Sequence, residues 1–346
     1  GKHSFNQDEQ DVSAESDLDL DLKLIENMVD EYTREYKENE RKNLAGYGDS
    51  NKIRDCSQTE LQDDEKQRFN TLNTLLISFQ KEYTRFPSFK NLESNLGRFH
   101  VLIKLCTKIE ELSKVNHSNI DENFYKFFQR MICEEKGCKN ESQLDESLKF
   151  IMNLRKDCLL IIRYLPGGQE SRAKTLIFQL ERSLKSLLGE LFSHSRIKFK
   201  QLSMDTPAKV FQRIIEYERV HPFVGEGWKD IQQRIGKFRR IFYLDHLAMP
   251  NYPLTFVEVA LFSTVATNMR QVFEYSTSLE SESEAENAIF YSISSIESGL
   301  KGIDFGNFLI KTAVKKLSTE NRNLKEFYTL SPVPGLLSWL MNKLED

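Results

Sequence analysis

Apolar residues recur at helical spacing through most of the first half of the chain. Between Glu65 and Phe192 they return every three or four positions, the interval that places side chains on one face of a helix. The clearest sets are Phe69, Leu72, Leu75, Leu76 and Phe79, then Leu96, Phe99 and Leu102, then Leu159, Ile162 and Leu165, and then Ile177, Leu180, Leu184, Leu187 and Leu188. The turn sequence Pro166-Gly167-Gly168 breaks the pattern between the last two sets. We therefore predict an all-helical domain over residues 61–195, with antiparallel helices joined by short polar turns.

An acidic, polar leader precedes this domain. Some of its apolar and aromatic residues still follow helical spacing, namely Leu18, Leu22, Ile25, Val29, Tyr32 and Tyr36. We predict one amphipathic helix within a leader that spans residues 1–60.

The pattern changes after Ser195, where runs of β-branched and aromatic residues appear. Segments 240–244, 254–262 and 288–296 indicate strands, and the turn-rich link at 249–253 favours a hairpin between the first two. A helix is predicted over 210–218, and the acidic stretch 279–286 is predicted to be a solvated loop. Beyond it come a glycine-bearing loop, a helix whose apolar face carries Leu309, Ile310, Ala313, Val314 and Leu317, a strand through 327–330, and a closing helix around Trp339. Residues 196–346 are therefore predicted to form a mixed α/β domain.

Composition narrows the class of protein. A chain of 346 residues favours two domains, because one hydrophobic core rarely grows this large. The net charge of −4 and the pI near 6.0 argue against nucleic acid as the main partner. The five cysteines form no CxxC pair and all lie in the first half, which is not the pattern of a secreted disulfide scaffold, and Cys133 and Cys138 lack the further ligands of a zinc site. No apolar run approaches the roughly 18 to 20 residues of a membrane span.

The glycine-bearing loop Gly299-Leu300-Lys301-Gly302-Ile303-Asp304-Phe305-Gly306-Asn307 is the first candidate for chemistry. It lies between a predicted strand and a predicted helix, where glycines let backbone N–H groups approach a phosphate at the amino end of the helix. Glycines in such a turn also serve purely steric needs, so the loop alone is a weak signal. We expect a β-branched side chain at Gly306 to obstruct the approach of a phosphate and to meet a positive φ.

Several separate motifs resemble the malonyl-CoA decarboxylase family in order and spacing. They are Arg219-Val220-His221-Pro222, Trp228, Arg234-Ile235-Gly236, Arg239-Arg240, Phe290-Tyr291-Ser292-Ile293-Ser294, Gly299-Leu300-Lys301-Gly302, Gly306-Asn307-Phe308-Leu309-Ile310-Lys311, Leu330-Ser331-Pro332-Val333-Pro334-Gly335 and Trp339. The resemblance is strongest from Asp205 to the end, while Leu154-Arg155-Lys156-Asp157 and Glu190-Leu191-Phe192 are its best anchors in the helical region. It implies a GNAT-like (acyl-CoA N-acyltransferase) fold for the second domain, after an all-helical domain that makes homo-oligomer contacts.

The resemblance also implies the site residues. Ser331 matches the family's catalytic serine, and Arg213 matches a basic position that supports the site. Malonyl-CoA is implied to bind through Ser331 and through the loop residues Lys301, Gly302, Ile303, Asp304, Phe305, Gly306 and Asn307. Lys301 departs from the glutamine usual in the family, and Asp304 is the acid that separates these decarboxylases from acetyltransferases. Without the family, Ser331 would be interpreted as a turn serine before a proline.

The implied reaction converts malonyl-CoA into acetyl-CoA and CO₂, which controls the malonyl-CoA level in fatty acid metabolism. Loss of CO₂ leaves an enolate of the thioester, so no metal, biotin or pyridoxal cofactor is required. Ser331 would orient the departing carboxylate. The family's proton donor is a histidine well beyond this serine, whereas no histidine follows His246 here, so we expect the catalytic domain to be incomplete at its carboxy end and the chain as given to be inactive. His221 and His246 are interpreted as structural.

Two alternatives stay open at this point. One is a noncatalytic acyl-CoA-binding or regulatory form of the same fold, and the other is an oligomerising helical scaffold with a vestigial second domain. The mitochondrial matrix is the expected compartment, with the peroxisome and the cytoplasm open as well, because the chain begins at Gly1 and a targeting peptide could precede it.

Overall fold

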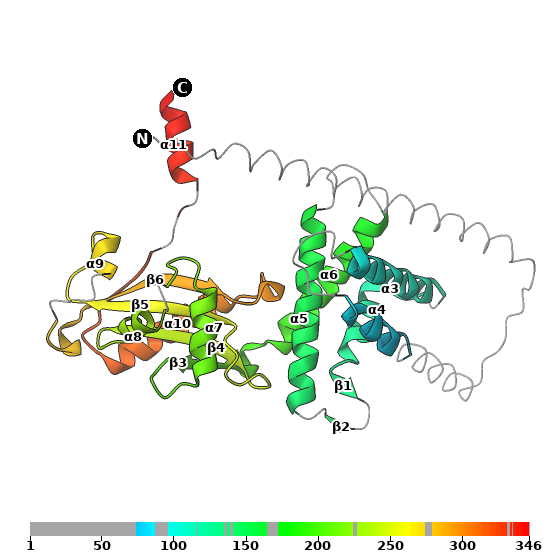
Figure 1. Cartoon of the computed structure of the whole chain (residues 1–346), viewed down its shortest axis with the longest axis horizontal. Helices are drawn as coiled ribbons and strands as arrows, with labels where there is room; N and C mark the ends of the chain where they lie inside the picture. The colour runs from blue at the N-terminus through cyan, green and yellow to red at the C-terminus, as the bar shows by residue number, and fades with distance from the viewer. Residues whose placement is uncertain are drawn as a thin grey trace, which may run out of the picture. The chain divides into compact units, whose positions relative to one another are not determined.

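The computed structural model describes residues 74–86, 96–115, 117–134, 137–138, 141–164, 172–223, 227–273, 279–330, 333 and 335–345 (Figure 1). The predicted leader, residues 1–60, lies outside the described residues, and so do Ser331, Pro332 and Pro334. The described chain divides into two compact units, one ending at Leu188 and the other beginning at Gly189.

The first unit is built from helices, as predicted. They are a helical segment over 74–84, α3 (Leu96–Val115), α4 (Ile120–Gln129), α5 (Glu141–Tyr164) and α6 (Arg172–Leu191), which continues into the second unit. Asn119 caps α4 by accepting from the amide of Asp121. A two-residue antiparallel ladder, β1 (Cys133–Glu134) with β2 (Gly137–Cys138), was not predicted, since so short a pair leaves no alternation in the sequence.

The core of this unit includes aromatic side chains and buried ion pairs. Phe124, Phe127 and Phe128 of α4 are fully buried and share the core with Phe79. Asp157 is also buried, and its carboxylate accepts from the Arg98 guanidinium at 2.6 Å and from the Tyr83 hydroxyl. A buried carboxylate needs such donors because burial without them would cost several kcal/mol.

The second unit contains a five-stranded mixed sheet in the order β3-β4-β5-β6-β7. The strands are β3 (Ile197–Gln201), β4 (Arg239–His246), β5 (Thr255–Phe262), β6 (Asn287–Ser295) and β7 (Glu326–Thr329). All neighbours are antiparallel except β6 and β7, which are parallel and joined by a helix. The hairpin predicted between β4 and β5 is confirmed, and β3 was not predicted.

Helices cover both faces of this sheet. Buried side chains of α7 (Ala208–Tyr217) and α8 (Trp228–Arg234) pack on Ile241, Tyr243 and Phe256, while the short α9 (Met269–Phe273) packs on the same face nearer β6. The other face of β4 and β5 is covered by α10 (Phe305–Glu320). Leu309, Ala313 and Leu317 form the apolar side of this helix, as predicted. Short 3₁₀ turns η2 (His194–Arg196), η3 (Glu282–Glu284) and η4 (Ser298–Leu300) and the last helix α11 (Leu336–Glu345) complete the unit.

The predicted fold class, a helical part followed by a mixed α/β sheet, is therefore confirmed. The β6-α10-β7 crossover, with helices on both faces, is consistent with the GNAT-like architecture that the resemblance implies. None of the described helices is both long enough and apolar enough to cross a bilayer.

Candidate functional site

Strands β6 and β7 separate next to the predicted serine. They pair in parallel as far as Phe290 and Thr329, and the amide of Leu330 still donates to the carbonyl of Phe290 at 2.8 Å. β6 then continues to Ser295, and within the described residues no strand pairs with this last part of β6 on the β7 side. Ser331 directly follows Leu330, although its own placement lies outside the described residues. The sheet therefore opens at the residue that precedes the predicted catalytic serine.

A β-bulge lies in β6 at the same level. The register between β5 and β6 shifts at Glu258, so that Tyr291 has no partner on β5. The side chain of Tyr291 packs in the core beside α9, and the hydroxyl of Ser292 donates to Glu218 at the end of α7, so two successive side chains reach the same face of the sheet. Bulges of this kind redirect side chains beside functional sites.

The predicted CoA-binding loop, residues 301–307, joins this end of β6 to α10. Asp304 is the N-cap of α10, because its carboxylate accepts from the amide of Asn307 at 3.3 Å, and the Asn307 side chain donates back to it at 3.1 Å. Lys301, Asp304 and Asn307 are exposed, whereas Phe305 is buried and anchors the loop to the core. The loop therefore presents polar groups and the amino end of a long helix to solvent.

The expectation that Gly306 has a positive φ is wrong. The left-handed residue of the loop is Gly302, with φ 81°. Gly306 lies in the first turn of α10, which begins at Phe305, and therefore has helical backbone angles. A Cβ added there would meet Ile293 Cδ1 of β6 at 3.5 Å, an ordinary contact that places the amino end of α10 against the unpaired part of β6.

Arg213 is held by Glu297, which precedes this loop, and by two residues of the link between β4 and β5. Its guanidinium pairs with Glu297, its Nε donates to the Pro253 carbonyl at 3.1 Å, and it lies 3.8 Å from the centre of the Tyr252 ring. The Tyr252 hydroxyl donates to the same Glu297 carboxylate at 2.7 Å, and burial together with this carboxylate raises the pKa of Tyr252. Because Glu297 directly precedes η4, Arg213 and Tyr252 fix the point where the loop leaves the strand.

Both histidines discussed above have backbone partners. His246 Nδ1 accepts from the amide of Ala248 at 3.1 Å, so the proton is on Nε2, which donates to the Leu191 carbonyl at 3.1 Å. Burial lowers the pKa of His246 and so favours this neutral form. His221 Nε2 lies 3.2 Å from the carbonyl oxygen of Tyr291, the bulge residue, to which it donates.

Two buried acids beside the opening were not singled out from the sequence. Glu218 accepts from the amides of Val220 and His221 at 2.8 and 2.7 Å, from the Ser292 hydroxyl at 2.8 and 2.9 Å and from the Ser294 hydroxyl at 3.2 Å. It thereby holds the turn after α7 against β6. The other acid, Glu258, lies in the middle of an apolar strand, and an acid in such a run is a sequence signal for a buried partner.

That partner is Arg234 of α8. Arg234 Nη1 donates to both oxygens of Glu258 at 3.1 and 3.0 Å, while its Nε and Nη2 donate to Asp230 at 3.1 and 2.9 Å. The guanidinium also lies 4.0 Å from the centre of the Phe223 ring. Burial raises the pKa of Glu258 to about 8, against the charge of Arg234, which lowers it.

Comparisons with known proteins support the family resemblance. Residues 196–346 match the family model described as the malonyl-CoA decarboxylase C-terminal domain. The mitochondrial malonyl-CoA decarboxylases of Rattus norvegicus and Mus musculus are 34% identical to this chain over 212 and 210 residues. The resemblance to malonyl-CoA decarboxylase is confirmed. The aligned segments cover 59% of this chain and 40% of each of these two proteins, so the chain spans less than half the length of the curated relatives it matches.

Crystal structures of bacterial malonyl-CoA decarboxylases share the fold. The structure from Rhodopseudomonas palustris superposes with a TM-score of 0.58 at 22% identity, covering 81% of this chain and 69% of that one. The structure from Agrobacterium vitis gives a TM-score of 0.57 at 25% identity, covering 78% and 67%.

In this malonyl-CoA decarboxylase-like domain, Arg213 and loop 301–307 both lie near the carboxyl end of β6. Arg213 pairs with Glu297, which lies four residues before loop 301–307 and just beyond the carboxyl end of β6. Ser331 follows the last residue that is hydrogen-bonded between β7 and β6. The roles of these residues stay predictions.

Proposed function

We propose that this protein is a malonyl-CoA decarboxylase that converts malonyl-CoA into acetyl-CoA and CO₂ and so controls the malonyl-CoA level in fatty acid metabolism. The main support is the match of residues 196–346 to the decarboxylase C-terminal domain. The end of the β6–β7 pairing just before Ser331 also supports it, because no strand of the described residues pairs with the last part of β6 on that side.

The CoA phosphates bind loop 301–307 and the amino end of α10 in this proposal. The N-terminus of a helix carries partial positive charge and N–H groups without helical partners. The Asp304 carboxylate already accepts a hydrogen bond from one of these amides, that of Asn307. The phosphates therefore lie towards Lys301 and Gly302. Gly302 has no side chain and a left-handed φ of 81°, which lets the backbone approach a phosphate closely.

Decarboxylation then occurs near Ser331. The bond between the carboxylate carbon and the neighbouring CH₂ carbon breaks, which releases CO₂, and its electron pair forms the thioester enolate. The former CH₂ carbon then takes up one proton to give acetyl-CoA. The Ser331 hydroxyl hydrogen-bonds the malonyl group and orients its carboxylate for departure. Because the thioester carbonyl is the electron sink, the step needs no cofactor.

Arg213 acts at a distance in this scheme. It holds Glu297 and Tyr252 and so positions the loop that binds CoA, without touching the reacting atoms.

We also propose a mitochondrial location and a homo-oligomer formed through the helical unit. The location is supported by the curated relatives, which are named mitochondrial malonyl-CoA decarboxylases. The oligomer rests on the family resemblance alone, and chromatography coupled to light scattering tests it.

The test of the function uses Ser331→Ala in the full-length protein, with Ser318→Ala on the exposed side of α10 as the matched control. Loss of the hydroxyl is expected to lower the rate of CO₂ release about 100-fold or more, while CoA affinity changes little, because the loop holds the nucleotide. Ser318→Ala is expected to behave like the wild type. If the wild-type protein binds CoA but releases no CO₂, the noncatalytic alternative replaces this proposal.

A further inference from the structure

The side chains of β6 change faces at its bulge. Before the bulge, Ile289 and Tyr291 face α9. Beyond it, Ser292 and Ser294 face the same side of the sheet, and their hydroxyls donate to Glu218 at the end of α7. Successive residues of a regular strand point to opposite faces, so the extra residue at the bulge moves every later side chain of β6 to the other face.

This change of face decides which side chain supports the predicted CoA-binding loop. Ile293 faces α10, and its Cδ1 lies 3.5 Å from the point that a Cβ on Gly306 would occupy. Without the bulge, the alternation of β6 would turn Ile293 to the opposite face and bring the polar Ser292 and Ser294 towards α10. The last residues of loop 301–307 form the first turn of α10, so the position of the loop depends on the bulge.

Tyr291, the residue without a partner on β5, is held at both ends. Its backbone carbonyl accepts from His221 Nε2 at 3.2 Å, and its hydroxyl donates to the buried carboxyl group of Glu258. Arg234 Nη1 in turn donates to both oxygens of Glu258, at 3.1 and 3.0 Å, and so fixes that carboxyl group. We call the two hydrogen bonds of Tyr291, from His221 and to Glu258, the Tyr291 clamp.

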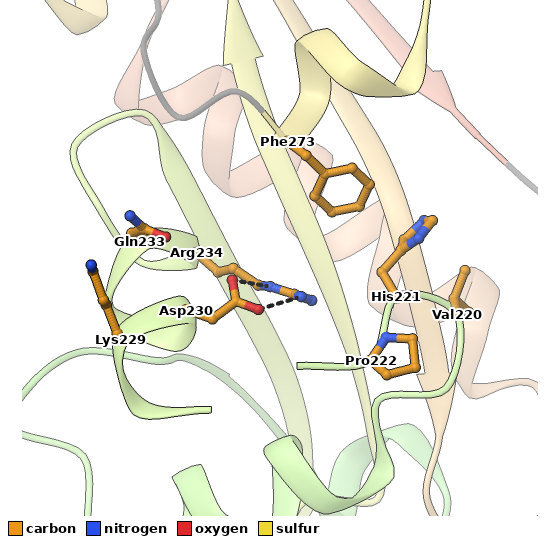
Figure 2. Close-up of a pocket in the computed structure, with 8 residues that line it drawn as sticks. All are labelled: Val220, His221, Pro222, Lys229, Asp230, Gln233, Arg234 and Phe273. Carbon is orange, nitrogen blue, oxygen red and sulfur yellow. Dashed lines mark hydrogen bonds and ion pairs between the residues drawn. The ribbon is translucent and has the colours of Figure 1, made fainter. Parts of the chain in front are cut away.

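Open space adjoins this clamp. A cavity of about 640 Å³ lies on the α7–α8 face of the sheet, and its lining includes His221, Arg234 and Phe273 (Figure 2). These side chains contact Tyr291 or its partner Glu258, and the ring centres of Phe273 and Tyr291 are 5.8 Å apart. Protein interiors are close-packed, and such packing fixes a strand from every side. Next to the cavity the bulge lacks part of that support, so it depends on the hydrogen bonds of the clamp.

We propose that His221 and Glu258 are positioning residues for CoA binding, because their hydrogen bonds to Tyr291 maintain the bulge that keeps Ile293 against the amino end of α10. The inference rests on the proposed function, which assigns CoA to loop 301–307. Neither residue touches CoA in this scheme. Loss of the clamp lets the carboxyl half of β6 shift its register, and the loop that follows the strand loses its fixed position.

Substitutions that open the clamp in the full-length protein supply the test. His221→Ala removes the donor to the Tyr291 carbonyl, whereas His221→Gln keeps an N–H donor on a side chain of similar length. Tyr291→Phe removes only the hydroxyl that donates to Glu258. Tyr243→Phe removes the hydroxyl of another buried tyrosine on the same face of the sheet and is the matched control.

Two quantities are measured on the folded proteins, the affinity for CoA by calorimetry and the amide hydrogen exchange of loop 301–307. His221→Ala and Tyr291→Phe are each expected to lower the affinity about fivefold and to speed exchange in the loop by a similar factor, because each loses one hydrogen bond. His221→Gln and Tyr243→Phe are expected to stay within about twofold of the wild type. A purely structural role would lower the free energy of unfolding and leave both quantities unchanged.

The outcomes separate this inference from the proposed function. Unchanged affinity and exchange in Tyr291→Phe, or an equal effect of Tyr243→Phe, would overturn the clamp whether or not malonyl-CoA is decarboxylated. This pair also decides the matter if His221→Ala does not fold. If the wild type releases no CO₂ from malonyl-CoA, the proposed function is rejected, and the exchange of loop 301–307 still decides whether the clamp positions the loop.

Discussion

Replacing Glu218 by alanine is expected to destabilise the sheet unit strongly. The carboxylate is buried and accepts from four donors, the amides of Val220 and His221 and the hydroxyls of Ser292 and Ser294. Each buried donor left without an acceptor costs about 1 to 3 kcal/mol. The two backbone amides are fixed by the turn, so each is expected to cost about 2 kcal/mol when it loses its acceptor. The two hydroxyls can rotate towards another acceptor, so each is expected to cost about 0.5 kcal/mol. The expected loss in the free energy of unfolding is therefore about 5 kcal/mol.

Thermal and urea unfolding measure this loss. For a unit of this size, 5 kcal/mol corresponds to a decrease in Tm of about 10 to 20 °C. Glu218→Gln keeps one acceptor oxygen and is expected to lose less. Glu216→Ala, an exposed acid on the same helix, is the matched control and is expected to change stability by no more than about 0.5 kcal/mol. A loss below about 1 kcal/mol for Glu218→Ala would show that these four donors do not depend on the carboxylate.

Three further predictions concern the loop and the buried acid. Gly306→Val is expected to weaken CoA binding without unfolding the helical unit, because a branched side chain there crowds the phosphate approach; loss of the helical circular dichroism signal would show a structural role instead. Tyr252→Phe removes one hydrogen bond to Glu297 and is expected to raise the KM for malonyl-CoA about fivefold with kcat unchanged, whereas an equal fall in kcat would place Tyr252 in the chemistry. Burial raises the pKa of Glu258 from 4.5 to about 8, so between these pH values the folded protein keeps a proton that the unfolded chain has released. The stability of the wild type is therefore expected to fall relative to that of Glu258→Gln as the pH rises from 4.5 to 8. A stability difference that does not vary with pH would contradict this.

The strands β4, β5 and β6 could be predicted because buried strands need continuous β-branched and aromatic residues. β3 was missed since it is an edge strand in which lysines alternate with apolar residues, as in Lys198 and Lys200. The short helices α8 and α9 offer too few turns for a helical period to show.

The site was less accessible from the sequence than the fold. The loop 301–307 carries its own glycine signal, but Ser331 and Arg213 could be named only through the family. Glu218 reaches Ser292, 74 positions later, and no local pattern encodes a contact of that kind. The backbone angle of Gly306 was misjudged because the first residue of α10 cannot be fixed from composition.

The most direct measurement follows the fate of malonyl-CoA with the full-length protein in D₂O. We predict CO₂ and acetyl-CoA in equal amounts, with one deuterium on the acetyl methyl group, because the enolate takes its proton from an acid that exchanges with solvent. Unchanged malonyl-CoA, or release of free CoA with malonate, would contradict it.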